Sequence, residues 1–330
     1  MVRSAKGILV SFRIACCIAT FAASAAESLA QQFPAKPVRF VAGMAAGGGA
    51  DLNVRRLADR LSKMWRQPVI VQNMAGGAGN LAAVAVAEAT PDGYTLLFAS
   101  HPIFAVNPIL YDRLPFDADR DFVPVVLVSK TPHVLLVHAA LPAARLSELI
   151  ALAKERPGSL NFGSGGLGTS IHLAAELMKN RAGVELTHVP YKGAAPAVTA
   201  LIGGEIQLLF DSSMTAIGHI RGGRVRGLVI ASMTRAAALP DLPTFNESGI
   251  PGFEAGVAHG VLVPSSTPAA IVSALNRAVN ATLNEPEYKK QMAEFGVELV
   301  GGSAGSFQAY LAAERKKWTE IIRKQGIKAN

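Results

Sequence analysis

The chain has 330 residues, of which 50% are hydrophobic and 17% are charged, and its net charge is +8 at pH 7. Both cysteines lie in the first thirty residues, so cysteine metal sites, disulfides and thiol nucleophiles are excluded from the rest of the chain. The basic residues are scattered or gathered near the C-terminus with few aromatic residues between them, which favours a solvated surface over a nucleic-acid site.

Residues 1–30 have the features of a cleavable signal peptide. Arg3 and Lys6 give a basic start, and residues 14–26 form an apolar or small run that is too short to cross a bilayer. Ser28-Leu29-Ala30 places small residues at the two positions that a signal peptidase reads, so we expect cleavage after Ala30 and export to the periplasm. About 300 residues then remain, enough for one large domain or two of ordinary size.

Short β-rich runs alternate with segments of helical period along the rest of the chain. Residues 146–153 keep one face apolar, as do residues 173–178, and both segments are predicted to be helices. This alternation predicts an α/β fold with mainly parallel sheets. The runs predicted to be strands are 38–42, 69–72, 95–99, 160–163, 186–189, 208–211 and 228–231.

Two places are predicted to carry the chain from one domain to another. Apolar runs at 123–128 and 134–137 are separated only by residues 129–133, and a second crossing is expected within 253–263. Two crossings build one domain from both ends of the chain and another from its middle, with a cleft between them where ligands bind. The expected boundaries are 31–132 for the first part of domain 1, 133–255 for domain 2 and 256–330 for the second part of domain 1.

Three glycine-rich turns open helices, at residues 43–50, 75–80 and 163–170. Glycine lets the backbone approach a ligand closely, and N–H groups at a helix start attract anions. The first turn precedes Asp51, which we interpret as the N-cap of the next helix and as a residue that orders the loop. The turns therefore indicate capture of an anion by backbone amides.

Rival interpretations of these motifs fail on their context. Gly163, Gly165 and Gly168 fit G-x-G-x-x-G, but the acidic residue that a dinucleotide fold needs at the end of the next strand is missing. Residues 301–305 fit G-x-S-x-G, but no histidine follows to complete a hydrolase triad. His133 and His138 have no matching carboxylates, so we interpret both as satisfied structural histidines rather than metal ligands.

With these residues considered, the chain resembles the extracytoplasmic solute-binding proteins of tripartite tricarboxylate transporters, the Bordetella uptake gene (Bug) type. The segments that carry the resemblance occur in the family's order and spacing over roughly 300 residues. They are KPVRFVAGMAAGGGAD, AGGAGN, PDGYTL, FGSGGLGTSIHLAAEL, VPYKGAAPAVTALIGGEIQLLFDS, LPDLPTFNESGIPGFEAG and LVPSSTPAAIVSALNRAV.

The resemblance implies a two-domain, periplasmic-binding-protein-like (Venus flytrap) fold that closes on a small organic acid without cofactor or metal. It also implies a monomer that delivers its ligand to a large and a small membrane subunit. The first glycine turn and the turn at 163–170 grip the carboxylate, and two further segments complete the wall. The residues so assigned are Met44, Ala45, Ala46, Gly47, Gly48, Asp51, Ser100, His101, Ser164, Gly165, Thr169, His172, Asp211 and His259.

This sequence departs from the family pattern at several of these positions. The family commonly has proline and phenylalanine at Gly43 and Met44, a hydroxyl residue at Ala50, and two aromatic residues at Ala258 and His259. The identity of the acid therefore stays open. Two other functions also stay open: an exported hydrolase or isomerase with His172 or His101 as base and Asp211 as its partner, and a sensor subunit that binds the same ligand.

Overall fold

Runs of valine, leucine and phenylalanine form the strands of the computed structural model, which describes residues 33–325. The strands of the first lobe pack against helices whose apolar residues recur every three or four positions, as Val54, Leu57 and Leu61 do in α2. The elements before the first crossing are β1 (Val38–Ala42), α2 (Gly49–Trp65), β2 (Val69–Asn73), η1 (Gly77–Gly79), α3 (Asn80–Ala87), β3 (Thr95–Ser100), α4 (His101–Ala105) and α5 (Asn107–Leu110).

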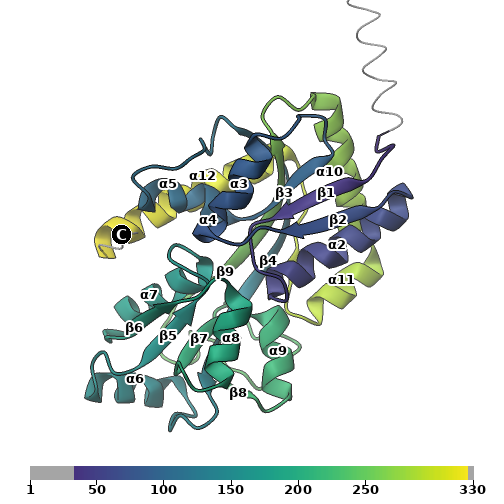
Figure 1. Ribbon diagram of the computed structural model, residues 1–330. Helices are drawn as coiled ribbons and strands as arrows, with labels where there is room; N and C mark the ends of the chain where they lie inside the picture. Colours follow the sequence, from purple (N-terminus) through teal and green to yellow (C-terminus); the bar gives the residue numbers. More distant parts are fainter. Residues whose placement is uncertain (1–32, 326–330) are drawn as a thin grey trace, which may run out of the picture.

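The second lobe is built from the middle of the chain, and the last elements return to the first lobe (Figure 1). The second lobe contains α6 (Leu146–Glu155), β5 (Asn161–Ser164), α7 (Ser170–Ala182), β6 (Thr187–Pro190), α8 (Ala194–Ile202), β7 (Leu208–Ser212), α9 (Ser213–Arg221) and β8 (Val225–Ile230). The returning elements are α10 (Ala269–Leu283), α11 (Pro286–Ala293), β10 (Glu298–Leu299) and α12 (Ala304–Gln325).

Two long strands, β4 (Phe122–His138) and β9 (Gly256–Pro264), run between the lobes (Figure 1). They pair with each other antiparallel from Phe122↔Pro264 to Pro132↔Gly256. Beyond that point β4 continues into the second lobe, where it pairs with β7 and β8. The two apolar runs predicted around residues 129–133 are therefore one strand that serves both lobes. We call β4 and β9 the crossing strands.

The sheet is mixed, which corrects the expectation of mainly parallel pairing. Within each lobe the strands near the glycine turns are parallel, since β1 pairs with β2 and β3, and β5 pairs with β6 and β7. The crossing strands pair antiparallel with their neighbours β3, β7, β8 and β10. The α/β class is as predicted, and the antiparallel pairs arise because the crossing strands must return between lobes.

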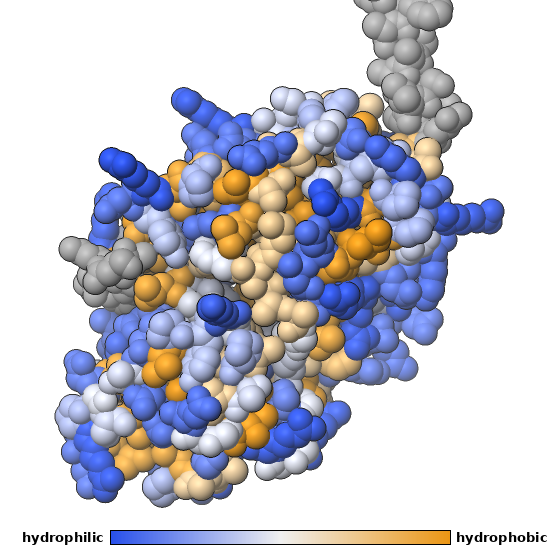
Figure 2. Space-filling model, in the orientation of Figure 1, coloured by the Kyte–Doolittle hydropathy of each residue, from blue (hydrophilic) through white to orange (hydrophobic). Residues whose placement is uncertain are grey.

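Each lobe has its own hydrophobic core. The buried core of the second lobe is drawn from residues between Val134 and Phe253. The main core of the first lobe joins residues near Phe40 and Phe98 to residues of the returning chain such as Val261. In Figure 2, a band of weakly hydrophobic side chains crosses the first lobe toward the junction of the lobes, while hydrophilic side chains cover much of the periphery.

Among residues 33–325, no helix is both long enough and apolar enough to cross a membrane. The predicted signal peptide and its cleavage site at Ala30 lie outside the described residues.

Candidate functional site

The front cavity, as we call it, lies between the lobes where the parallel strands end. The carboxyl ends of β1, β2 and β3 meet at one edge of the sheet, and those of β5, β6 and β7 meet at another. Ligands of α/β proteins bind at such edges. The cavity has a volume of about 330 Å³, within the range of about 300–1,000 Å³ that is typical of small-molecule sites.

The predicted residues divide into those that line the front cavity and those that do not. The lining includes Met44, Ala45, Gly48, Ser100, Gly165, Thr169, Asp211 and His259. Ala46, Gly47, Asp51, His101, Ser164 and His172 are not part of the lining. Residues that the sequence interpretation missed include Ala75 to Gly79, Tyr111, His133, Tyr191, Lys192, Gly193 and Ser212.

Asp51 orders the first turn through hydrogen bonds but does not cap the helix that follows it. Helix α2 begins at Gly49 with Gly48 as its N-cap, so the interpretation of Asp51 as the N-cap is wrong. The Asp51 carboxylate instead accepts hydrogen bonds from the Gly47 amide (2.9 Å), from Arg55 Nε (2.9 Å) and from Asn73 Nδ2 (2.8 Å). Burial alone would raise the pKa of Asp51, but these hydrogen bonds outweigh it and lower the pKa below its ordinary value.

The second turn, residues 75–80, lies beside the first because β2 pairs in parallel with β1. Gly76, Gly79 and Ala78 all have positive φ, which bends the backbone sharply before α3. The end of this turn is fixed by a buried hydrogen bond of 2.6 Å from Asn107 Nδ2 to Asn80 Oδ1. The motif AGGAGN was visible in the sequence, and the order of the strands would have placed it at the cavity.

The third turn, residues 163–170, uses its hydroxyl groups internally. The Ser164 hydroxyl accepts a hydrogen bond from the Gly166 amide (3.0 Å) and lies 2.6 Å from His188 Nε2. Thr169 is the N-cap of α7, and its hydroxyl donates to the Gly166 carbonyl at 2.7 Å. Gly165 and Thr169 line the cavity, whereas Ser164 supports the turn from behind.

His172 also supports the third turn. Its Nδ1 accepts a hydrogen bond from the Gly168 amide at 3.3 Å, and its ring lies 4.4 Å from the ring of His188, measured between centroids. Burial, and then the charge of Lys179, lowers the pKa of His172 to about 4. The ring is therefore neutral at neutral pH and contacts the turn rather than the cavity.

The floor of the front cavity, as we define it, consists of Asp211, His133 and His259. Asp211 ends β7, and the two histidines come from the crossing strands. Burial raises the pKa of Asp211 to about 6, and burial lowers the pKa of both His133 and His259 to about 3. His133 is buried beside the Asp211 backbone, which acts on its pKa against the larger effect of burial, so its interpretation as a structural histidine stays a prediction.

The lips of the front cavity meet across the junction of the lobes. A β-carbon built on Gly193 would lie 2.6 Å from the Ala45 β-carbon, and one built on Gly168 would lie 3.1 Å from Asn107 Oδ1. Lys192, next to Gly193, brings a positive charge to the wall. The two lobes are therefore in contact at the lips of the cavity.

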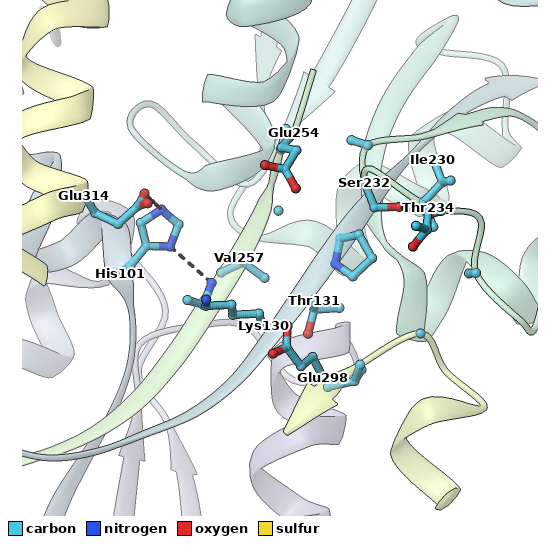
Figure 3. Close-up of a pocket in the computed structure, with 18 of the residues that line it drawn as sticks. His101, Lys130, Thr131, Ile230, Ser232, Thr234, Glu254, Val257, Glu298 and Glu314 are labelled. Atoms are coloured by element: carbon cyan, nitrogen blue, oxygen red, sulfur yellow. Dashed lines mark hydrogen bonds and ion pairs between the residues drawn. The ribbon is translucent and has the colours of Figure 1, made fainter. Parts of the chain in front are cut away.

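His101 belongs to a different space, which we call the rear cavity, on the far side of the crossing strands (Figure 3). Its Nδ1 accepts a hydrogen bond from the Ala258 amide at 3.2 Å, and its Nε2 lies 3.4 Å from Glu314 Oε2. Burial, and then the charge of Lys317, lowers the pKa of His101 to about 3. The rear cavity measures about 510 Å³, and Val257 lines both cavities.

Comparisons with known proteins show what this chain is similar to. The sequence model of the tripartite tricarboxylate transporter family receptor matches residues 53–327. The UPF0065 protein in the tcbD-tcbE intergenic region of Pseudomonas sp. (strain P51) is 38% identical over 299 residues, which cover 90% of this chain and 89% of that protein. Protein BugT of Bordetella pertussis is 35% identical over 305 residues, which cover 92% of this chain and 94% of BugT.

Solved structures show the same arrangement of lobes. The structure of R. palustris Rpa4515 with adipate has a TM-score of 0.87 and 35% identity, and the match covers 90% of this chain and 99% of that one. The structure of MatC from Rhodopseudomonas palustris with bound malate has a TM-score of 0.83 and 31% identity, and covers 88% of this chain and all of that one (100%). The first of these structures contains adipate and the second contains malate.

Proposed function

The chain belongs to the tripartite tricarboxylate transporter receptor family, and from that premise we propose that it captures a small organic anion in the front cavity. Closure of the two lobes traps the ligand, and opening releases it to a large and a small membrane subunit. No bond in the ligand is made or broken. The observation that carries this proposal is the meeting of three glycine turns from two lobes around one cavity.

Backbone amides are a suitable trap for a ligand that must later leave. Four hydrogen bonds to a carboxylate, at about 1.5–3 kcal/mol each, supply about 6–12 kcal/mol before the costs of association. A micromolar dissociation constant corresponds to about 8 kcal/mol. Lys192 is the positive side chain in the cavity lining, and it lies at the wall rather than in the floor. Release therefore needs no change in the charge of a buried partner.

The related structures support a carboxylate as the ligand, because Rpa4515 was solved with adipate and MatC with malate. The hydrolase or isomerase alternative loses support, since its base was His172 or His101 and neither side chain lines the front cavity. A sensor subunit would use the same cavity and differ in the surface that docks on its receptor.

A thermal-shift screen tests the proposal. The purified protein is heated with mono-, di- and tricarboxylates, aromatic acids, amino acids and nicotinamide compounds. A ligand at a hundred times its dissociation constant stabilises the folded protein by about 2.7 kcal/mol, so we expect a clear shift with at least one acid that is recovered unchanged. A shift with neutral or nucleotide compounds alone, or conversion of the acid, would contradict the proposal.

The proposed location and delivery need separate tests. We expect N-terminal sequencing of the exported protein to begin at Gln31, as cleavage after Ala30 requires. For delivery, we expect deletion of the gene to abolish uptake of the acid found in the screen, and expression of the chain to restore it. Unchanged uptake in the deletion strain would favour the sensor alternative.

A further inference from the structure

Two histidines lie behind the third glycine turn. His172 follows the turn in α7, and His188 lies on β6, where it is the register partner of Phe162 on β5. The ring centroids of the two histidines are 4.4 Å apart, and the ring of His188 stacks on that of Phe162 at 4.8 Å. Side chains two residues apart on a strand share a face, so Ser164 follows Phe162 on the face that carries these rings.

The Ser164 hydroxyl joins His188 to the turn. Its oxygen lies 2.6 Å from His188 Nε2 and accepts a hydrogen bond from the Gly166 amide at 3.0 Å. The Gly166 carbonyl oxygen lies 3.2 Å from the same hydroxyl and accepts a second hydrogen bond, of 2.7 Å, from the Thr169 hydroxyl. Burial, and then the neighbouring His172, lowers the pKa of His188 to about 4, so the ring is neutral at neutral pH.

These hydrogen bonds set the direction of the next peptide group. The C=O and the N–H of a trans peptide point in opposite directions. Because the Gly166 carbonyl points to the Ser164 hydroxyl behind the turn, the N–H of Leu167 points away from it, and Leu167 lines the front cavity. An N–H so directed is a donor for an anion in that cavity.

Glycine by itself does not fix this arrangement. Gly166 and Gly168 have φ of +117° and +77°, a region that glycine enters without steric cost but populates about as readily as negative φ. The peptide groups on either side of Gly166 are therefore free to rotate unless side chains hold them. Ser164 holds them from behind, and His188 is the side chain that contacts its hydroxyl from the neighbouring strand.

We propose that His188 is a positioning residue for capture of the acid and that it acts through Ser164. By fixing the Ser164 hydroxyl it holds Gly166, and the Leu167 amide then faces the acid. His188 does not contact the acid itself, because it is not part of the front cavity lining. The inference rests on the proposed capture of an organic acid in the front cavity and names a residue on which that capture depends.

Two substitutions separate the His188 nitrogen from the bulk of the ring. His188→Leu removes the polar atom, whereas His188→Gln places an amide near the position of Nε2, where it donates or accepts in place of either tautomer. Amide hydrogen exchange of the ligand-free proteins, resolved by NMR, reports on the turn. We expect exchange at Gly166 to be at least tenfold faster in His188→Leu than in the wild type, and within threefold of the wild type in His188→Gln.

The amides of β7 serve as the internal control of this experiment. We expect their exchange to stay within threefold of the wild type in both variants, because β7 lies in the core of the same lobe and does not depend on the turn. A general loss of stability would speed exchange at β7 as well as at Gly166 and would overturn the positioning role. If His188→Leu does not fold, Ser164→Ala must by itself speed exchange at Gly166, and an unchanged rate there overturns the inference.

Calorimetry measures the effect on binding, with adipate, malate and each acid that shifts thermal unfolding as probes. We expect His188→Leu and Ser164→Ala each to weaken binding at least tenfold, and His188→Gln to stay within threefold of the wild type. The double variant should lose no more than either single variant, because both substitutions break the same contact. The matched control is His219→Leu, a half-buried histidine of the same lobe outside the front cavity lining, and its affinity should be unchanged.

The outcomes separate this inference from the proposed function. Equal losses in His188→Gln and His188→Leu would overturn the inference, because the ring rather than its nitrogen would then matter. Additive losses in the double variant would also overturn it, because His188 would then act independently of Ser164. Binding of no acid by the wild type would instead remove the proposed function, and with it the role of His188 in capture, even where exchange at Gly166 responds as expected.

Discussion

The front and rear cavities share the crossing strands as a wall but differ in what they offer to a ligand. The front cavity is lined by three glycine turns, which bring backbone amides to it. The rear cavity is lined by exposed charges of both signs from both lobes, including Lys130, Glu254 and Glu298 (Figure 3). Water already solvates exposed charges, whereas the amides of a glycine turn at a helix start can bind an anion.

This difference indicates which cavity binds the ligand and which cavity changes shape when the lobes move. Val257 lines both cavities, so only one strand separates them. When the front lips open, the lobes must rotate about the crossing strands and change the rear space. Solvated charges tolerate such a change at little cost in free energy. We therefore assign capture to the front cavity and adaptation to the rear one.

The largest expected effect comes from a wedge at the front lips. Ala45 faces Gly193 so closely that a tryptophan at position 45 would prevent the lobes from closing. We expect Ala45→Trp to weaken binding of the acid found in the screen at least a hundredfold, about 2.7 kcal/mol, by calorimetry. Ala45 is only partly buried, so thermal unfolding without ligand should stay close to that of the wild type.

The matched rear variant is Thr234→Trp, at an exposed residue of the rear cavity lining. We expect it to leave the dissociation constant unchanged or to lower it, because filling the rear space does not obstruct the front lips. A hundredfold loss from the rear variant, with no loss from Ala45→Trp, would reverse the assignment of the two cavities.

Acid pH is expected to change the stability of the protein through titratable side chains on both sides of the crossing strands. Burial lowers the pKa of His133, His259 and the rear His101 to about 3. The stability of the folded protein that depends on these rings being neutral is therefore complete above pH 6.5 and is lost as pH falls. Asp211 acts in the opposite direction, because its pKa is raised to about 6 and its protonation favours folding as pH falls.

The net effect can be measured by chemical unfolding of the ligand-free protein at pH 6.5 and 5.5. His133, His259, His101 and His172 lose about 1 kcal/mol each over this interval, the partly exposed His188 loses less, and Asp211 returns somewhat less than 1, so we expect the free energy of unfolding to fall by about 3–4 kcal/mol. A free energy of unfolding that rises or stays constant over the interval would show that these rings are not buried and neutral.

A smaller effect is expected from the carboxylate that orders the first turn. Asp51→Ala leaves the Gly47 amide, Arg55 and Asn73 without their partner, which we expect to cost about 1.5 kcal/mol of stability and to weaken binding about fivefold. Chemical unfolding and calorimetry measure the two effects. The control is Asp59→Ala on the same helix, where Asp59 pairs with Lys63 at the exposed surface. Equal losses in both variants would contradict the role of Asp51.

The smallest expected effect is a difference in stability between two threonine variants. Thr169 caps α7 at the front cavity, so Thr169→Ala should cost about 1 kcal/mol of stability in chemical unfolding. Thr234, exposed in the rear cavity, is neither a cap nor buried, and Thr234→Ala should change stability by less than about 0.5 kcal/mol. A larger loss from the rear variant would show that the rear lining is more than a solvated surface.

The sequence predicted the strands and the glycine turns of this fold because both depend on local patterns. The runs at 38–42 and 95–99 became β1 and β3 with nearly the same bounds. The unity of β4 could not be predicted, because its middle carries Ser129, Thr131 and His133, polar residues that are buried only through tertiary pairing.

The site residues could be predicted where the sequence matches the family pattern. They could not be predicted where the arrangement of strands and helices determines which cavity a side chain lines. Ser100 and His101 were assigned to one wall, but Ser100 ends β3 and His101 begins α4, and Ser100 lines the front cavity whereas His101 lines the rear. The burial of His133 has no sequence signal, because it depends on which strands pair around it.

Hydrogen–deuterium exchange with and without the acid found in the thermal-shift screen tests the assignment of capture to the front cavity most directly. We expect the bound acid to slow exchange at the amides of residues 43–49, 76–80 and 165–170, and to leave the rear residues 293–298 unchanged. Slower exchange at 293–298 without protection of the glycine turns would contradict the account, because the ligand would then occupy the rear cavity.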